Sequence, residues 1–301
     1  MIVSASYRTD VPAFYGPWFL ARLAEGSVRV RNPYGGADTT VRLRGPDTAG
    51  YVFWTRNPRP FADGFAAVAA LGLPFVVHLT ITGYPRALDR SVIPADRAVA
   101  AARDLAGRYG PRAVVWRYDP VVWTDLTPPD WHRRQVDRLS AALRGVTDEV
   151  VFSAATIYRK TRRNLALAAG THGFAWQDPD AGEKAALLAE LASIATEHGL
   201  QATLCSQPGL LAPPLAPAVC VDPARLSDVA GGRAITARRR ANRPGCLCAE
   251  SRDIGAYDTC PHGCVYCYAV SNRQRAVARH AAHTPADAML GHPPGSQGSQ
   301  A

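Results

Sequence analysis

Cysteine thiols are the side chains of this sequence whose number and spacing point most directly to chemistry. The chain has 301 residues and seven cysteines, five of which fall between residues 246 and 267. In a reducing compartment such clustered thiols serve metal or redox chemistry instead of disulfides. Cys260, Cys264 and Cys267 follow one another at spacings of four and three residues, so one tight loop can hold three corners of a metal cluster. Three ligands leave the fourth corner open for a small molecule.

We therefore predict a four-iron, four-sulfur (4Fe-4S) cluster held by these three thiolates. Gly263 would let the backbone pass close to the cluster. Tyr266 and Tyr268 would shield it from solvent, which is one of the factors that set its reduction potential.

Four cysteines remain, and they suit either a second iron–sulfur cluster with four thiolate ligands or a structural zinc ion. They are Cys205, Cys220, Cys246 and Cys248. The alternative is that Cys205 or Cys220 is a small buried hydrophobic residue. We favour Cys246 and Cys248 as ligands, because a Cys-x-Cys pair in a loop rich in proline and glycine is an unusual core element.

The elements that must position these residues alternate between short β-branched or aromatic runs and amphipathic stretches. Strands are predicted at 2–6, 51–55, 75–82, 113–118, 150–154 and 201–205. Helices are predicted near 14–25, 61–71, 94–107, 130–144, 161–168, 183–198 and 272–282. Repeated β-α order predicts an α/β fold with a parallel sheet, and we favour a TIM-barrel-like (β/α) barrel.

Three regions follow from this pattern. Residues 1–222 form the β/α barrel body, and residues 223–283 form a cysteine-rich segment that completes the barrel and binds the cluster. The tail at 284–301 has the composition of a disordered segment.

Polar residues follow the predicted strands, at the end where parallel α/β proteins place their active sites. Each taken singly fits a capping or loop-anchoring role. Together they are expected to line a site for a polar, partly anionic ligand, and they include Thr9, Asp10, Thr55, Arg56 and Arg117.

The charge balance is basic, with 34 Lys and Arg against 25 Asp and Glu and a net charge of +9. Basic clusters occur at 159–163 and 238–243. They allow a nucleic-acid partner, although solvated arginine faces are the more frequent explanation. Arg8 and Asp10 come too early for a signal peptide, and no apolar run is long enough to cross a membrane. We therefore expect a soluble cytoplasmic protein with no membrane partner.

The loop Cys-Pro-His-Gly-Cys-Val-Tyr-Cys-Tyr-Ala at 260–269 resembles the signature of radical S-adenosylmethionine (radical SAM) enzymes, and most closely that of spore photoproduct lyase and its relatives. This resemblance implies that the open iron chelates the amino and carboxylate groups of S-adenosylmethionine. It also implies an electron donor such as ferredoxin or flavodoxin, and cleavage of S-adenosylmethionine to a deoxyadenosyl radical.

Longer motifs at 4–10, 53–58, 116–120 and 253–257 resemble an uncharacterised bacterial family, domain of unknown function 1848, over nearly residues 1–270. Radical SAM enzymes carry the cysteine loop after the first barrel strand, whereas here it lies near the C-terminus. The resemblance therefore implies a circular permutation, with 253–257 as the first strand and 2–10 as the second. It assigns Thr9 and Asp10 to S-adenosylmethionine, with Thr55 and Arg56 after the next strand. No Gly-Gly-Glu element follows the second strand.

Three functions are open at this point. The first is a radical SAM-like iron–sulfur enzyme, of lyase or oxidoreductase type, with an unknown substrate. The second is a binding protein stapled by zinc or a closed cluster, with its arginines on nucleic acid. The third is a hydrolase using Asp10, Asp119 and His78 around a divalent metal, but His78 is better explained as a hydrogen-bonded core histidine.

Overall fold

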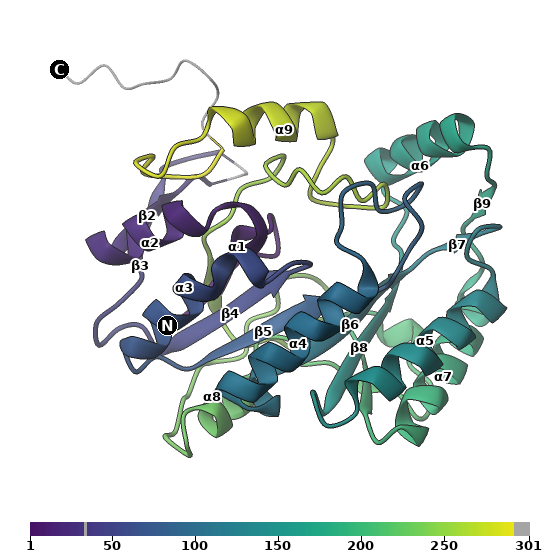
Figure 1. The fold of residues 1–301 in the computed structure, drawn as a ribbon, viewed down its shortest axis with the longest axis horizontal. Coiled ribbons are helices and arrows are strands. Elements are labelled where there is room, and N and C mark those ends of the chain that lie inside the picture. Colours follow the sequence, from purple (N-terminus) through teal and green to yellow (C-terminus); the bar gives the residue numbers. More distant parts are fainter. Residues whose placement is uncertain (33–34, 292–301) are drawn as a thin grey trace.

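The centre of the molecule is an open, eight-stranded parallel sheet (Figure 1). The computed structural model describes residues 1–32 and 35–291. The strands stand in the order β11 (Ala216–Pro217), β10 (Gln201–Leu204), β8 (Glu149–Ala154), β6 (Val114–Val121), β5 (Phe75–Thr80), β4 (Gly50–Thr55), β1 (Ile2–Ala5) and β12 (Ser251–Asp253). The predicted α/β class and parallel sheet are confirmed. Within the described residues no pairing joins the edge strands β11 and β12, so a closed barrel is not found.

Strand β12 brings the C-terminal segment of the chain beside its first strand. Ile2 pairs with Ser251 and Ser4 with Asp253, in parallel. The Asp253 carboxylate accepts hydrogen bonds from Ser4 Oγ at 2.8 Å, Ser6 Oγ at 2.7 Å and the Tyr7 amide at 3.0 Å. The strand that the resemblance implied at 253–257 is found instead at Ser251–Asp253, so only Asp253 is shared. The Asp253 carboxylate holds this strand end against β1.

One face of the sheet is covered by helices (Figure 1). Side chains such as Phe53, Val77, Trp116 and Phe152 form the main hydrophobic core on that side. The helices that follow the early strands are α1 (Val11–Phe14), α2 (Gly16–Glu25), α3 (Ala62–Ala70), α4 (Ala95–Tyr109), α5 (Pro129–Leu143) and α7 (Ala181–Glu197). Apart from the short α1, they occupy the positions predicted from the sequence pattern to within a few residues.

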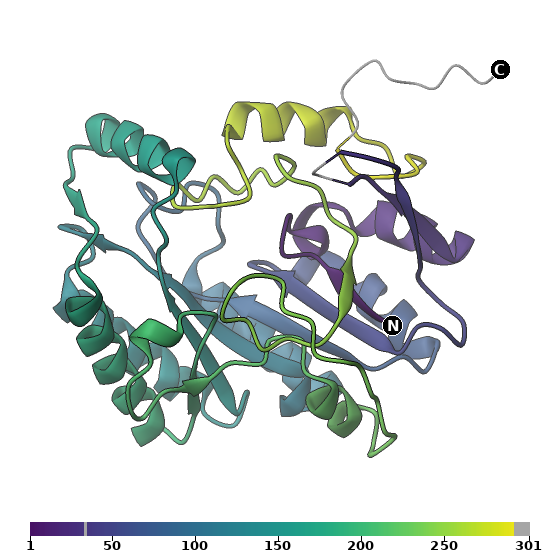
Figure 2. The ribbon, with the colours of Figure 1, turned by 180° about the vertical axis from the view of Figure 1, so that it is seen from behind.

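The opposite face is covered mainly by irregular chain (Figure 2). Val52, Val76, Val115 and Val151 pack there against the segment 205–249, which includes helix α8 (Pro223–Val229). All four cysteines outside the 260–267 loop belong to this second core. The strands are apolar on both faces because both faces are buried.

Two helices lie at the end of the molecule that carries the cysteine loop, α6 (Arg159–His172) and α9 (Arg273–Ala282) (Figure 1). Short pairs that the sequence did not predict are β2 (Ser27–Val30) with β3 (Thr39–Arg42), and β7 (Trp123–Thr124) with β9 (Trp176–Gln177). In the predicted tail, Met289 and Leu290 are buried, and residues 292–301 lie outside the described part. None of the described helices has the length and apolarity needed to cross a bilayer.

Candidate functional site

The loop 260–267 is held in a fixed shape beside the sheet. The Cys267 amide donates to the Cys264 carbonyl at 3.1 Å, and the Val265 amide donates to the Leu88 carbonyl at 3.0 Å. Gly263 has a φ of 79°, and a Cβ there would lie 2.5 Å from the Arg273 side chain. Burial raises the pKa of all three thiols, Cys260, Cys264 and Cys267. Each of these thiols therefore keeps its proton unless a cation lies beside its sulfur.

A buried guanidinium contacts this loop. Arg56 pairs with Asp89 at 2.7 Å, donates to Thr82 Oγ1 at 2.7 Å and donates to Cys264 Sγ at 3.3 Å. It also hydrogen bonds to the Tyr266 hydroxyl. The sequence placed Arg56 at the site but missed Asp89, which lies in an irregular segment with no motif. The two terminal nitrogens of Arg56 are thus occupied by protein groups.

Asp10 ties three parts of the site together. Its Oδ1 accepts the Ala13 amide at 2.9 Å and so caps α1. Its Oδ2 accepts the Arg56 amide at 2.8 Å and lies 2.8 Å from Nε2 of His262, within the cysteine loop. Asp10 is therefore a positioning residue. His262 also belongs to this site; it lies in the cysteine motif, but no role for it was predicted from the sequence.

The two predicted threonines differ in their contacts. Thr55 Oγ1 accepts the Asn57 amide at 2.9 Å, which is a local turn bond. Thr9 is buried, and its Oγ1 has no hydrogen-bond partner among the described residues. A buried hydroxyl without a partner is costly, so Thr9 has a donor and acceptor free for a ligand.

The other four cysteines form a contiguous buried group, named here the four-cysteine group. Cys205 and Cys220 have their sulfurs 3.6 Å apart. Cys248 interacts with Cys220 on one side and Cys246 on the other, and its Sγ accepts the Val221 amide at 3.3 Å. Hydrogen bonding from Cys248 lowers the pKa of Cys246 to about 5, whereas the hydrogen bond to Cys220, together with burial, raises the pKa of Cys205.

Two guanidinium groups donate to sulfurs of the four-cysteine group. Arg117 donates to Cys220 Sγ at 3.2 Å, and Arg243 donates to Cys205 Sγ at 3.2 Å. Arg117 is buried and paired with Asp119. Arg117, which the sequence grouped with the first site, thus contacts the four-cysteine group, and Arg243 was noted only as part of a basic cluster.

Aromatic rings complete the wall around Arg117. Its guanidinium lies 5.2 Å from the Trp54 ring centroid, and that ring stacks on His78 with centroids 4.4 Å apart. His78 is buried, with Nε2 2.7 Å from the Cys220 carbonyl oxygen. Burial, reinforced by the Arg117 charge, holds the pKa of His78 well below its usual range. A neutral, hydrogen-bonded core histidine fits this position better than a metal ligand.

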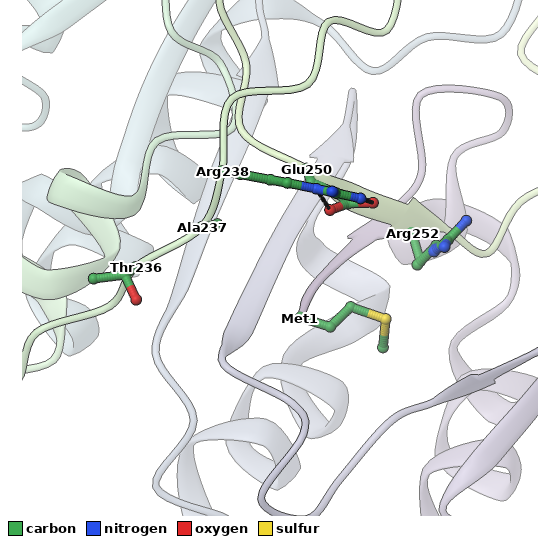
Figure 3. A pocket seen from close by; sticks show the side chains of 6 residues that line it. All are labelled: Met1, Thr236, Ala237, Arg238, Glu250 and Arg252. Carbon is green, nitrogen blue, oxygen red and sulfur yellow. Dashed lines mark hydrogen bonds and ion pairs between the residues drawn. The ribbon is translucent and has the colours of Figure 1, made fainter.

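The structure gives no ready-made ion site. Within residues 1–32 and 35–291, no group of three or more His, Cys, Asp or Glu side chains has the arrangement needed to hold a metal ion. A cavity of about 370 Å³ adjoins Arg56, Thr82 and Asp89. A second hollow of about 310 Å³ lies between Met1, Arg238 and Glu250 at the start of the neighbouring strands β1 and β12 (Figure 3). No cysteine lines either hollow.

These features define a parallel α/β protein with two cysteine groups. One is partly exposed in a loop after the edge strand β12, and the other is buried on a face of the sheet. A family model described as a domain of unknown function, DUF1848, matches residues 2–269, and the chain belongs to this family. The curated proteins and the solved structures contain no match to it.

Proposed function

We propose that the protein is an iron–sulfur enzyme of radical SAM type. Cys260, Cys264 and Cys267 would hold a 4Fe-4S cluster with one open iron. The observation that carries the proposal is the loop itself: one short segment offers three thiols at spacings of four and three residues, and Arg56 donates to one of the sulfurs. When bound, such a cluster supplies the electron that cleaves S-adenosylmethionine.

The strand order supports a permuted barrel of this type. When β12 is placed before β1, neighbouring strands in the sheet follow one another in chain order. The cysteine loop then follows the first strand, as in the enzymes that the loop resembles. The finer description, a permuted and open radical SAM-type barrel, is part of this proposal.

The residues around the loop would divide the work. Thr9 offers an unpartnered buried hydroxyl to S-adenosylmethionine. Asp10 and Arg56 would act on the cofactor indirectly, because their polar atoms already hold α1, His262, Asp89 and Cys264 in place. Thr55 would shape the turn after β4. Arg117 would serve the four-cysteine group.

The four-cysteine group favours a second thiolate-bound centre, either a closed iron–sulfur cluster or zinc. Arg117 and Arg243 each donate to a sulfur, and a guanidinium stabilises a thiolate more than a neutral thiol. If this were the chain's only metal centre, the protein would be a stapled binding protein without radical chemistry, which is the second candidate function.

Anaerobic purification followed by iron, sulfide and zinc analysis separates these functions. The radical enzyme is expected to be brown and oxygen-sensitive, and to release deoxyadenosine when reduced by dithionite, or by ferredoxin or flavodoxin, with S-adenosylmethionine present. Zinc as the only metal would overturn the iron–sulfur proposal. A loaded cluster that yields no deoxyadenosine would overturn the radical SAM part alone.

A further inference from the structure

Two helices of the chain carry basic residues without any acidic ones. Helices α6 and α9 together have seven of the 34 lysines and arginines: Arg159, Lys160, Arg162, Arg163, Arg273, Arg275 and Arg279. The longer helices α4, α5 and α7 carry both signs. Helices α4 and α5 each have three arginines and two aspartates, and α7 has one lysine and three glutamates.

Both helices adjoin the cysteine loop. Arg163 of α6 donates to the Ser271 carbonyl just before α9, and Asn164 donates to the Val270 carbonyl at 3.5 Å. The buried side of α6 packs in one hydrophobic cluster with Tyr266. Figures 1 and 2 show α6 and α9 along the same end of the molecule, which we name the basic surface.

The cations of the basic surface are poorly compensated. Among the described residues, only Arg275 has a carboxylate within ion-pair distance, Asp258 at 4.0 Å. Arg159, Arg162, Arg163 and Arg275 are exposed. Burial, together with the charge of Arg90, lowers the pKa of Arg273, a sign that cations crowd one another here.

This distribution works against helix stability. Arg159 lies three and four residues before Arg162 and Arg163, and Arg275 lies four before Arg279, so like charges face each other along both helices. Cations in the first turn of a helix also oppose its dipole. A composition biased to arginine explains the scarcity of lysine but not the missing acids, since α4 and α5 have them. An anionic partner would remove the cost.

We propose that the basic surface binds a single nucleic-acid strand through its phosphates and presents it to the cysteine loop. Presentation of the strand to the cysteine loop rests on the proposed function, whereas binding of the strand to the basic surface does not. Tyr158 at the start of α6 is 46% exposed and Tyr268 beside Cys267 is 38% exposed, so each offers a ring on which an unpaired base can stack. The exposed apolar side chains of these helices, Leu167 and Val277, are too few for an anionic membrane to be the better fit.

Fluorescence anisotropy with labelled single strands of about 20 nucleotides tests the surface. The variant R159Q/R162Q/R275Q should bind about tenfold more weakly than the parent, and the slope of log affinity against log salt should fall by about 2, for three lost phosphate contacts. The control R97Q/R108Q/R134Q removes three exposed arginines from α4 and α5, and its affinity should stay within about twofold of the parent.

Three results would overturn the inference: no binding by the parent, equal weakening in both variants, or preferential binding to vesicles of phosphatidylserine and phosphatidylcholine. The variant C264A separates this inference from the proposed function. It should bind the strand as the parent does even if its iron is lost. If the parent does not bind the strand, the iron analysis still tests the proposed function. If the parent binds no iron, the anisotropy measurement still tests the basic surface.

Discussion

The two cysteine groups differ in how the chain builds them. The loop draws its three cysteines from eight consecutive residues, and backbone hydrogen bonds within and beside the loop set its shape. The four-cysteine group draws on positions 205, 220, 246 and 248, which meet only when segment 205–249 packs on the sheet. A metal at the loop would therefore serve chemistry, whereas a metal in the four-cysteine group would also hold a face of the sheet covered.

The two groups share one device. Each has a buried arginine that donates to a cysteine sulfur and is itself paired with an aspartate, Arg56 with Asp89 at the loop and Arg117 with Asp119 at the four-cysteine group. Hydrogen bonds to cluster sulfurs are among the factors that tune reduction potential. Because a guanidinium stabilises a thiolate, the same arginine–aspartate arrangement beside both cysteine groups favours thiolates in both.

The largest expected effect comes from C264A, which removes one of the three loop thiolates. Two remaining ligands cannot hold the open cluster, so its electron paramagnetic resonance signal after reduction should disappear. C205A is the matched control in the four-cysteine group and should keep that signal. Iron content and spectrum unchanged in C264A would refute the assignment of the loop.

Removing Cys246 and Cys248 together tests the structural side of the comparison. The variant C246A/C248A should lose the second metal, and thermal unfolding should move down by about 10 °C, since a bound structural metal contributes to folding free energy. C264A should shift the melting temperature much less. Equal shifts of the melting temperature in the two variants would show that the four-cysteine group stabilises the fold no more than the cysteine loop does.

Substitution of Arg56 should lower the free energy of unfolding even when no metal is bound, because it breaks a charge pair beside the cysteine loop. R56Q leaves the buried Asp89 carboxylate without its cationic partner, with only the Thr82 and Tyr266 hydroxyls donating to it. This loss should cost about 3 kcal/mol of unfolding free energy in denaturant titrations. The double variant R56Q/D89N should recover part of that loss, because the uncompensated charge is gone. If the double variant is as unstable as the sum of the two single variants, the pair is not coupled.

The loss of stability at acid pH tests a residue outside both cysteine groups. His132 is buried, with Nδ1 2.7 Å from the Tyr118 hydroxyl, and burial lowers its pKa to about 4. Its contribution to stability is complete above the unfolded value near 6.5 and is lost as pH falls toward 4, by about 3 kcal/mol. The variant H132Q should flatten this part of the stability profile. A profile of unchanged steepness would assign the acid loss to other groups.

The comparison also shows which parts of the site a sequence can predict. Most strands of the central sheet and its longer helices were predicted from the apolar pattern, which is a local signal. The spacing of Cys260, Cys264 and Cys267 is local too. The residues that contact the cysteine sulfurs come from segments distant in the sequence. Asp89 reaches Cys264 through Arg56 from a segment without a motif, and Arg117 lies on the face of β6 that packs on the four-cysteine group. Counting residues to a strand end does not say which face a side chain occupies.

The smallest expected effect separates a ligand contact from a scaffold contact beside the loop. T9V replaces an unpartnered buried hydroxyl by a methyl group of similar size, so unfolding free energy should not fall. If Thr9 contacts S-adenosylmethionine, affinity measured by equilibrium dialysis on the iron-loaded protein should fall by about fivefold, the value of one hydrogen bond. D10A should instead lower stability, because Asp10 holds α1, β4 and His262 together. A destabilised T9V with unchanged affinity would make Thr9 a part of the scaffold like Asp10.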